Sequence, residues 1–276
     1  MIKKLSNKTK AIKLFAKNMR KDILDMALVA GANSSHFGGA LSIVEILSVL
    51  FKEKIKYRAD PSWPDRDRFI LSKGHACLAF YAALHQIGFL KNSDLKTFEK
   101  NESNLMGHPV LNKKIGIDFS TGSLGMGLSI GIGTSLAAKK KKKNYTTYVI
   151  IGDGECNEGS IWESAMAAPN LKLNNLVVIL DNNGFQQTGK NSDILNLKNL
   201  SAKWKSFGWE TVTVDGHNIG KILKALKNGP SKKPKIIIAE TIKGRGFSFS
   251  ENNNSWHHSV LSKSNYEQGL KELNGN

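Results

Sequence analysis

The sequence predicts an α/β fold with a doubly wound, mostly parallel sheet, because short strand-like runs alternate with helical patterns along the chain. The expected strands cover residues 68–72, 145–151, 176–180, 209–214 and 235–240. Strands that alternate with helices in this way imply a sheet covered by helices on both faces. Polar or glycine-rich residues follow several of them, and open α/β sheets bind their ligands at the carboxyl ends of the strands.

Two helices are expected before the first strand. Apolar residues recur at helical spacing through residues 10–28 and again through residues 41–50. Between these segments, residues 30–40 form a turn of small side chains, and residues 57–67 form a polar loop with prolines.

The later helices lie between the strands, and one polar section has no clear pattern. The helices are expected at residues 76–87, from a glycine-rich run at 119–129 onward to Ala138, at 159–168 and at 218–226, and the polar section covers 91–114. The chain has no internal repeat and no low-complexity linker. We therefore interpret residues 1–276 as a single domain, with a core from about residue 10 to residue 260 and a short C-terminal tail.

The charge of the chain is unusual, at +17 over 276 residues. Its lysines are spread along the sequence, and the one dense run, at residues 139–143, lies in a predicted connection without interleaved aromatic residues. We therefore expect no nucleic-acid binding, although a binder of that class stays as a distant alternative. Phosphorylated small molecules and an acidic partner explain the charge better.

The compartment is predicted from cysteine content and from the chain's start. The chain has two cysteines, Cys77 and Cys156, which argues against a disulfide framework. Its first residues lack the apolar core of a secretory signal, and no apolar stretch is long enough to span a bilayer. We expect a cytoplasmic protein with no membrane partner, and neither cysteine stands in a nucleophile motif.

The strongest chemical signal follows two predicted strands. Asp153, flanked by Gly152 and Gly154, comes directly after one strand, and Asn183 follows the next strand along the chain. A carboxylate and an amide oxygen from adjacent strand ends suit Mg²⁺ that holds a diphosphate. Either motif alone is more typical of a tight turn, but the two at this spacing favour an ion site.

These residues carry a resemblance to a known family. The segment from Gly152 to Asn183 is similar to the thiamine diphosphate fingerprint of the transketolase superfamily, and residues 152–163 resemble the N-terminal section of transketolases encoded as two chains. The resemblance covers about residues 14–257 and implies the thiamine-diphosphate-binding fold. It implies that Asp153, Asn183 and the Phe185 carbonyl bind Mg²⁺, and that Gly154 contacts the cofactor diphosphate.

Further acidic and glycine-rich elements match the same family. Glu158 and Glu163 resemble family acids near the subunit interface. The glycine-rich run at 121–127, which simple helix packing also produces, resembles an element that touches the cofactor aminopyrimidine. The cofactor contacts implied there are Gly122, Ser123 and Leu124, and Met126 stands where the family usually has glutamine.

Four histidines stand in polar or glycine-flanked turns. A single histidine in a turn is more often structural, but His36, His75, His108 and His257 together resemble the transketolase histidines that line the cleft. Imidazole suits chemistry that moves protons on sugar hydroxyls near neutral pH. The resemblance also implies cofactor contacts for His75, His257 and Lys243.

The other histidines depart from these motifs. His85 and His217 fit none of them and are interpreted as structural or exposed. His258 and Ser259 follow His257 where the family usually has glycine.

The resemblance also implies a partner. Thiamine chemistry needs a glutamate at the aminopyrimidine N1′, which transketolases carry in a pyrimidine-binding domain that follows the matched region. We therefore expect the partner to be a C-terminal transketolase subunit in an α2β2 assembly, which transfers a two-carbon ketol unit from a ketose or its phosphate to an aldose or its phosphate. The alternatives are a transketolase-like enzyme of modified-sugar or surface-polysaccharide synthesis, a 2-oxo acid dehydrogenase subunit, which the histidine set disfavours, and a non-catalytic regulatory module with this fold.

Overall fold

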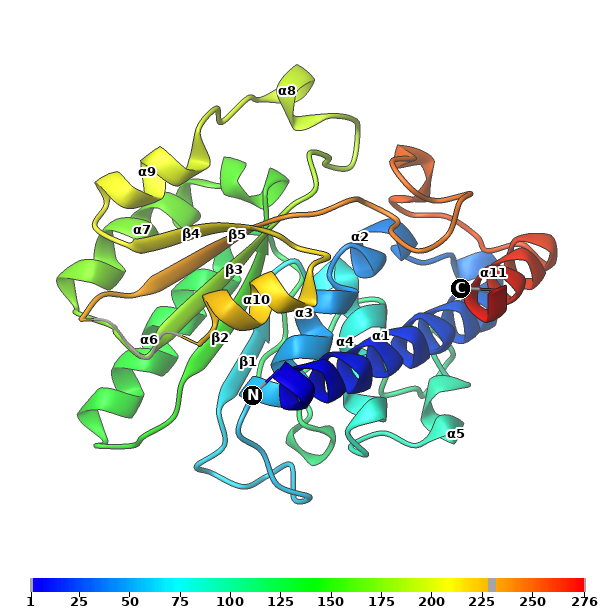
Figure 1. The fold of residues 1–276 in the computed structure, drawn as a ribbon, viewed down its shortest axis with the longest axis horizontal. Helices are drawn as coiled ribbons and strands as arrows, with labels where there is room; N and C mark the ends of the chain where they lie inside the picture. Colours follow the sequence, from blue (N-terminus) through cyan, green and yellow to red (C-terminus); the bar gives the residue numbers. More distant parts are fainter. Residues whose placement is uncertain (1, 228–231, 276) are drawn as a thin grey trace.

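The computed structural model describes residues 2–227 and 232–275, and within them the strands form one parallel sheet (Figure 1). The strands are β1 (Arg68–Leu71), β2 (Thr147–Gly152), β3 (Leu176–Asn182), β4 (Glu210–Asp215) and β5 (Lys235–Glu240). Their order across the sheet is β1-β2-β3-β5-β4, and each neighbouring pair is parallel. The predicted fold class is confirmed.

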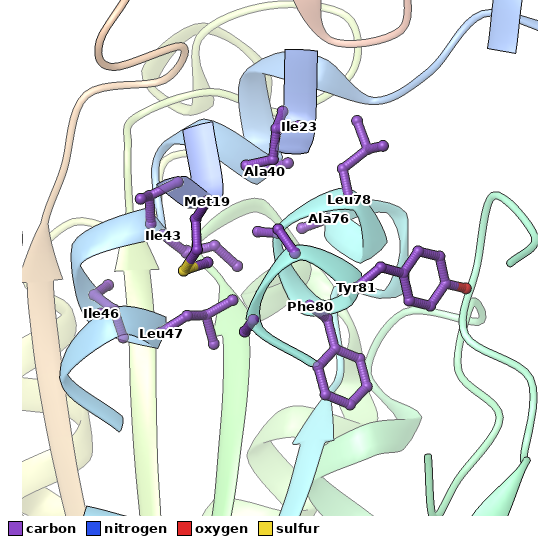
Figure 2. Close-up of a cluster of buried hydrophobic side chains, with 14 of the residues drawn as sticks. Met19, Ile23, Ala40, Ile43, Ile46, Leu47, Ala76, Leu78, Phe80 and Tyr81 are labelled. Atoms are coloured by element: carbon purple, nitrogen blue, oxygen red, sulfur yellow. The ribbon is translucent and has the colours of Figure 1, made fainter. Parts of the chain in front are cut away.

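Helices cover both faces of this sheet (Figure 1). Since successive side chains of a strand point to opposite faces, the strands contribute to two separate apolar clusters, one on each face. In β2, Ile150 belongs to one cluster, whereas Val149 and Ile151 belong to the other. Figure 1 shows the first group of helices on one side of the sheet: α1 (Ile2–Ala30), α2 (Phe37–Leu41), α3 (Val44–Val49), α4 (Cys77–Gln86) and α10 (Ile219–Ala225). Figure 2 shows part of the cluster that these helices bury, in which Met19, Ile43 and Phe80 are labelled. The other side of the sheet carries α6 (Met126–Lys140), α7 (Gly159–Asn170) and α9 (Leu200–Ser206).

The expected helix at residues 41–50 is interrupted. It consists of the end of α2, then α3, then a π-helical turn at Leu50–Lys54. At the break, the Ser42 hydroxyl lies 2.7 Å from the Asp181 carboxylate and 3.0 Å from the Gly39 carbonyl. A serine side chain that bonds to nearby backbone competes with the helix ladder, which accounts for the interruption at this point.

Some elements were absent from the sequence interpretation. The segment expected as a C-terminal tail forms α11 (Lys263–Gly275), which packs against α1 through Gly269 and Leu24, with the Tyr266 hydroxyl 2.9 Å from Asp25 Oδ1. The polar section at 91–114 contains α5 (Asn92–Leu95) and buries Phe98. The remaining short elements are α8 (Asn191–Ile194) and 3₁₀ turns at Gly31–Asn33, Gly74–Ala76, Lys113–Ile115, Gly154–Asn157 and Asn254–Trp256.

The strand register brings several strand ends together at one edge of the sheet. Gly152 pairs with Asp181, and Asn182 pairs with Glu240. The residues that follow β1, β2, β3 and β5 therefore lie side by side. Within the two described ranges, no helix is both long and apolar enough to cross a bilayer.

Candidate active site

A cavity of about 570 Å³ lies at this edge of the sheet. The residues that line it come from distant parts of the chain and meet near the carboxyl ends of the strands. Its walls include most of the residues predicted for the site: His36, His75, His108, Gly122, Leu124, Asp153, Gly154, Asn183, Phe185 and His257. Most residues predicted for the site from the sequence therefore line one cavity in the fold.

Asp153 lies buried at the end of β2, with 3% of its surface exposed. Its carboxylate accepts hydrogen bonds from the backbone N–H of Gly154 at 2.8 Å and of Gly184 at 2.6 Å. Burial, together with the nearby Asp181 carboxylate, raises the pKa of Asp153 to about 6. A divalent cation bound beside this carboxylate would favour its ionised form.

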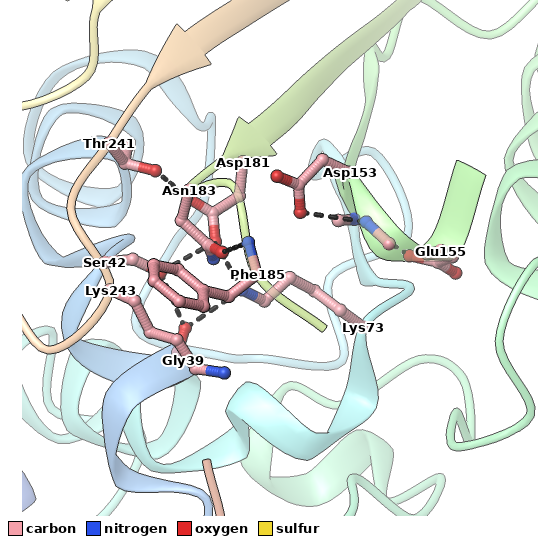
Figure 3. A network of polar contacts seen from close by, with 12 residues as sticks. Gly39, Ser42, Lys73, Asp153, Glu155, Asp181, Asn183, Phe185, Thr241 and Lys243 are labelled. Atoms are coloured by element: carbon pink, nitrogen blue, oxygen red, sulfur yellow. Dashed lines mark hydrogen bonds and ion pairs between the residues drawn. The ribbon is translucent and has the colours of Figure 1, made fainter. Parts of the chain in front are cut away.

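Asn183 lines the same cavity as Asp153, and both residues are labelled in Figure 3. Its side-chain NH₂ donates to Asp181 at 2.9 Å, and its Oδ1 accepts from the backbone N–H of Phe185 at 3.0 Å. These bonds fix which end of the amide is the oxygen. The described part of the chain has no group of three His, Cys, Asp or Glu residues that could hold a metal, so an ion here would need amide and carbonyl oxygens beside Asp153.

Asp181 organises the floor of the site, although the sequence interpretation had assigned it no role. It is fully buried and forms an ion pair with Lys73, which is also buried. It also accepts hydrogen bonds from Ser42, Asn183 and Thr241 (Figure 3). Although burial opposes ionisation, the Lys73 ammonium and the hydroxyls of Thr241 and Ser42 hold the pKa of Asp181 below its usual value. The sequence signal was an acid and a lysine directly at two strand ends.

Glu155 is a second organising residue that the sequence interpretation did not single out. One carboxylate oxygen accepts from the backbone N–H of Gly125 at 2.8 Å and from the Ser72 hydroxyl, and the other accepts from the Gly152 N–H at 3.0 Å. Burial raises the pKa of Glu155. One side chain therefore joins the glycine-rich turn to the ends of β1 and β2.

The glycine-rich turn before α6 reaches the cavity in part. Gly122 and Leu124 line it, and a Cβ added at Gly122 would lie 3.4 Å from the His108 ring. Ser123 is exposed and lies outside the cavity wall. Gly125, with a φ of 84°, makes the left-handed turn into α6 that a residue with a side chain would resist.

The four predicted histidines converge on one point. The ring centroid of His36 lies 5.3 Å from that of His75, 5.6 Å from that of His108 and 5.4 Å from that of His257. Burial and the neighbouring positive charges lower the pKa of His36 to about 3 and that of His257 to about 4, and they also lower the pKa of His75 and His108. Neutral imidazoles can each donate one hydrogen bond and accept another.

Lys243 lies behind His257 rather than in the cavity wall. Its ammonium lies 2.9 Å from His257 Nδ1 and 2.6 Å from Asn254 Oδ1. Burial lowers the pKa of Lys243 to about 8. Lys243 therefore orients His257 and adds positive charge close to the cavity.

The remaining residues noted in the sequence have clear places. His85 pairs with Asp22 at 2.9 Å, and His217 pairs with Glu45 at 2.9 Å, so both are structural as expected. Burial raises the pKa of the Cys156 thiol well above its usual value, which leaves no reactive thiolate. The residues left over are Glu158, exposed at the cavity rim, Glu163, exposed on α7, and His258, whose ring lies 4.3 Å from that of His36.

Comparison with known proteins gives one consistent family. Residues 13–275 match the family model described as "Transketolase, thiamine diphosphate binding domain". The chain is 37% identical over 265 residues to an apulose-4-phosphate transketolase subunit of Phocaeicola vulgatus, in a match that covers 95% of this chain and 93% of that protein. It is 40% identical over 241 residues to a 6-deoxy-6-sulfo-D-fructose transketolase subunit of a Clostridium species, at 86% and 88% coverage.

Solved structures agree with these matches. The transketolase from Leishmania mexicana superposes with a TM-score of 0.87 and 29% sequence identity over 95% of this chain. The match covers 41% of that longer protein, so this chain is similar in length to the two subunits above and spans about two fifths of the solved relative.

Proposed function

The chain belongs to the transketolase family, and from that premise we propose that it is the diphosphate-binding subunit of a thiamine-diphosphate-dependent transketolase. The observation that carries the proposal is that Asp153, Asn183 and the four histidines line one cavity. An ion site for a diphosphate and a set of proton-handling groups are the two parts that ketol transfer requires from this half of an enzyme.

The proposed ion ligands are the side chains of Asp153 and Asn183 and the carbonyl of Phe185, with Mg²⁺ as the ion. The Asp153 carboxylate lies at the wall of the cavity beside Asn183, which supports a shared cation. Asp181 accepts a hydrogen bond from the Asn183 side-chain NH₂ and so fixes the position of the Asn183 oxygen. Gly154, Gly122, Ser123 and Leu124 are the proposed cofactor contacts, together with His75, His257 and Lys243. Ser123 is the weakest of these assignments, because it lies outside the cavity wall.

The chain's own contribution to the reaction comes from the histidines. Bound thiamine diphosphate supplies the carbanion chemistry that cleaves and forms the carbon–carbon bond. His36, His75, His108 and His257 would hold sugar hydroxyls, donate to the developing alkoxide and take up or return protons. Their lowered pKa values keep them neutral near pH 7, so that each ring can both give and accept a hydrogen bond.

We propose that a second, pyrimidine-binding subunit completes the site with the N1′ glutamate. Two relatives that the match covers at 93% and 88% of their own length are named as transketolase subunits, which supports a divided enzyme. Exposed Glu158 and Glu163 are available to such a partner. We propose an α2β2 assembly in the cytoplasm.

The proposed substrates are a ketose donor and an aldose acceptor, as free sugars or phosphates. The relatives' names include apulose-4-phosphate and 6-deoxy-6-sulfo-D-fructose, which supports specialised sugars as a second possibility beside common sugar phosphates. A panel of such sugars, assayed with the reconstituted pair of subunits, distinguishes the two.

The ion site can be tested by calorimetry with thiamine diphosphate and Mg²⁺ in the presence of the partner subunit. Asp153→Asn removes the charged ligand, and we expect it to weaken Mg²⁺-dependent cofactor binding by about tenfold to a hundredfold. Asp193→Asn, which changes an exposed acid in α8, is the matched control and should bind as the native chain does. Equal binding by both variants would exclude Asp153 as a ligand.

The catalytic proposal needs a separate measurement. We expect ketol transfer from the two subunits together and none from either alone. Transfer by this chain alone would refute the divided site. Tight cofactor binding without transfer on any sugar would instead favour a non-catalytic module.

A further inference from the structure

A second, smaller cavity adjoins the proposed active site. Its volume is about 130 Å³, and it shares His36 and His108 with the larger cavity. Its wall also includes Ser34, Ser35, Glu99 and His258. His36 and His108 belong to the proposed catalytic histidines, whereas the two serines, Glu99 and His258 have no role in the proposed reaction so far.

Two polar groups of this pocket have no partner within the chain. Ser35 is buried, with 4% of its surface exposed, and its hydroxyl makes no hydrogen bond to any described residue. The Glu99 carboxylate likewise makes no hydrogen bond or ion pair within residues 2–227 and 232–275. Buried polar groups are usually satisfied, so the unpaired Ser35 hydroxyl is unusual, whereas the partly exposed Glu99 carboxylate is open to a polar ligand that enters the pocket.

The fold holds Glu99 in this position. Its backbone N–H donates to the Leu105 carbonyl at 3.0 Å, and its own carbonyl accepts from the Asn33 side chain at 2.7 Å. A Cβ added at Gly107 would lie 2.3 Å from the Glu99 carboxylate, so glycine at this position leaves the space that the carboxylate occupies. The carboxylate is therefore directed by its surroundings rather than free on the surface.

His258 closes the pocket on the side of the catalytic histidines. Its ring lies 4.3 Å from the His36 ring, and its Nε2 lies 3.1 Å from the Ser34 hydroxyl. It therefore adds a hydrogen-bonding ring at the junction of the two cavities.

The charge of the pocket restricts what it can bind. The described wall contains a carboxylate, imidazoles and hydroxyls, but no lysine or arginine. A phosphate or sulfonate would meet the Glu99 charge without a cation to balance it. Neighbouring hydroxyls of a sugar fit well, because a carboxylate accepts two hydrogens and the serine and histidine groups both donate and accept.

We propose that this pocket is a subsite for the uncharged, hydroxyl-bearing chain of the sugar substrate, with Glu99 as its specificity-determining residue. The inference rests on the proposed ketol transfer and adds to it the chemical class recognised beside the histidines. The volume allows several water molecules or a short polyol segment. His258 then binds a hydroxyl next to those bound by Glu99.

The kinetic test uses the complex of this chain with its partner subunit. For the acceptor, kcat/KM for D-ribose is divided by that for glycolaldehyde, and for the donor the value for an unphosphorylated ketose is divided by that for hydroxypyruvate. Glu99→Gln keeps the shape but removes the charge, and we expect at least one ratio to fall by about tenfold or more. Glu102→Gln, an exposed acid three residues away, should leave both ratios as in the native enzyme.

Two kinetic outcomes have different meanings. If both ratios are unchanged in Glu99→Gln while the enzyme transfers ketol units, the subsite is wrong and the proposed function stands. If no sugar pair is converted by the native complex, the proposed function fails instead.

A binding measurement on the isolated chain is independent of activity. We expect D-ribose to shift the ring NMR signals of His108 and His258, inorganic phosphate not to shift them, and Glu99→Gln to weaken the ribose effect. Equal shifts with phosphate, or a ribose effect that Glu99→Gln leaves intact, would overturn the proposal.

Discussion

At the level of single residues, the site rests on buried charges that would not themselves ligate the ion. Lys73 and Asp181 form an ion pair beneath the cavity, and Asp181 also accepts a hydrogen bond from the Asn183 side-chain NH₂. Glu155 binds three groups from two strand ends and the glycine-rich turn. The proposed ligand Asn183 thus depends on Asp181 for its orientation, and the turn at Gly125 depends on Glu155 for its place.

The buried pair gives a prediction about stability. Asp181→Asn leaves the Lys73 ammonium buried without its counter-charge, and breaking such a pair costs about 3–5 kcal/mol of unfolding free energy. Urea denaturation of the cofactor-free chain measures it. Adding Lys73→Met to that variant removes the uncompensated charge and should restore part of the loss.

The matched control is Asp65→Asn, which breaks the exposed pair with Lys143. Exposed ion pairs contribute little, so this change should not alter the denaturation curve measurably. An Asp181→Asn variant as stable as Asp65→Asn would mean that the buried pair is not an organising contact.

The sequence could indicate some of these residues but not others. Asp153 and Asn183 follow strands and stand in recognisable motifs, so their shared place in one cavity could be expected. Asp181 belongs to β3 itself, and a sequence does not show which strand residue turns toward a buried lysine 108 positions away. Glu99 and His258 became neighbours of one pocket only through the packing of loops from distant parts of the chain.

At the level of elements, close contact between α6 and the sheet positions the glycine-rich turn. A Cβ added at Gly127 would lie 2.7 Å from the Cα of Ser72, and one at Gly131 would lie 2.6 Å from the Val149 side chain. Glycine therefore lets the first turns of α6 approach β1 and β2. Gly133, farther along the same helix, has open space at the corresponding point.

This contrast gives a matched pair of substitutions. Gly127→Ala forces α6 and the end of β1 apart, and we expect it to lower the unfolding free energy by about 1–3 kcal/mol. Gly133→Ala meets no neighbour and removes the entropic cost of a helical glycine, so it should raise stability by about 0.5–1 kcal/mol. Thermal or urea unfolding of both variants checks the prediction, and a stabilising Gly127→Ala would contradict the close packing.

The elements themselves were predictable to different degrees. Each of the five expected strands was found within about two residues of its predicted limits, because short apolar or alternating runs between turn residues are strong local signals. The interruption near Ser42 was not predictable, since it depends on a contact with Asp181, 139 positions later. The helix α11 was not predicted; few of its residues are apolar, and it packs against α1 through Gly269.

At the level of the whole molecule, the positive net charge and the clustering of histidines both oppose the protonation of those histidines. The chain carries +17 before any histidine is protonated. His36, His257 and His258 crowd into one region, and Lys243 lies beside His257. Each proton added there meets both burial and existing positive charge, which is why the pKa of His36 falls to about 3.

Acidification is therefore expected to destabilise the cofactor-free chain through this cluster. The pKa of His36 is about 3 in the folded protein against an ordinary value of 6.5, so the unfolded chain takes up the proton first. Stability that depends on neutral His36 is complete above about pH 6.5 and is lost progressively as the pH falls toward 3. His36→Gln cannot take up that proton, so its unfolding free energy should fall less between pH 7 and pH 4.5 than that of the native chain. His257→Gln, whose histidine has a folded pKa of about 4, should act in the same direction. Urea denaturation at a series of pH values measures the three curves, and parallel curves would show that the histidine cluster does not set the acid sensitivity of this fold.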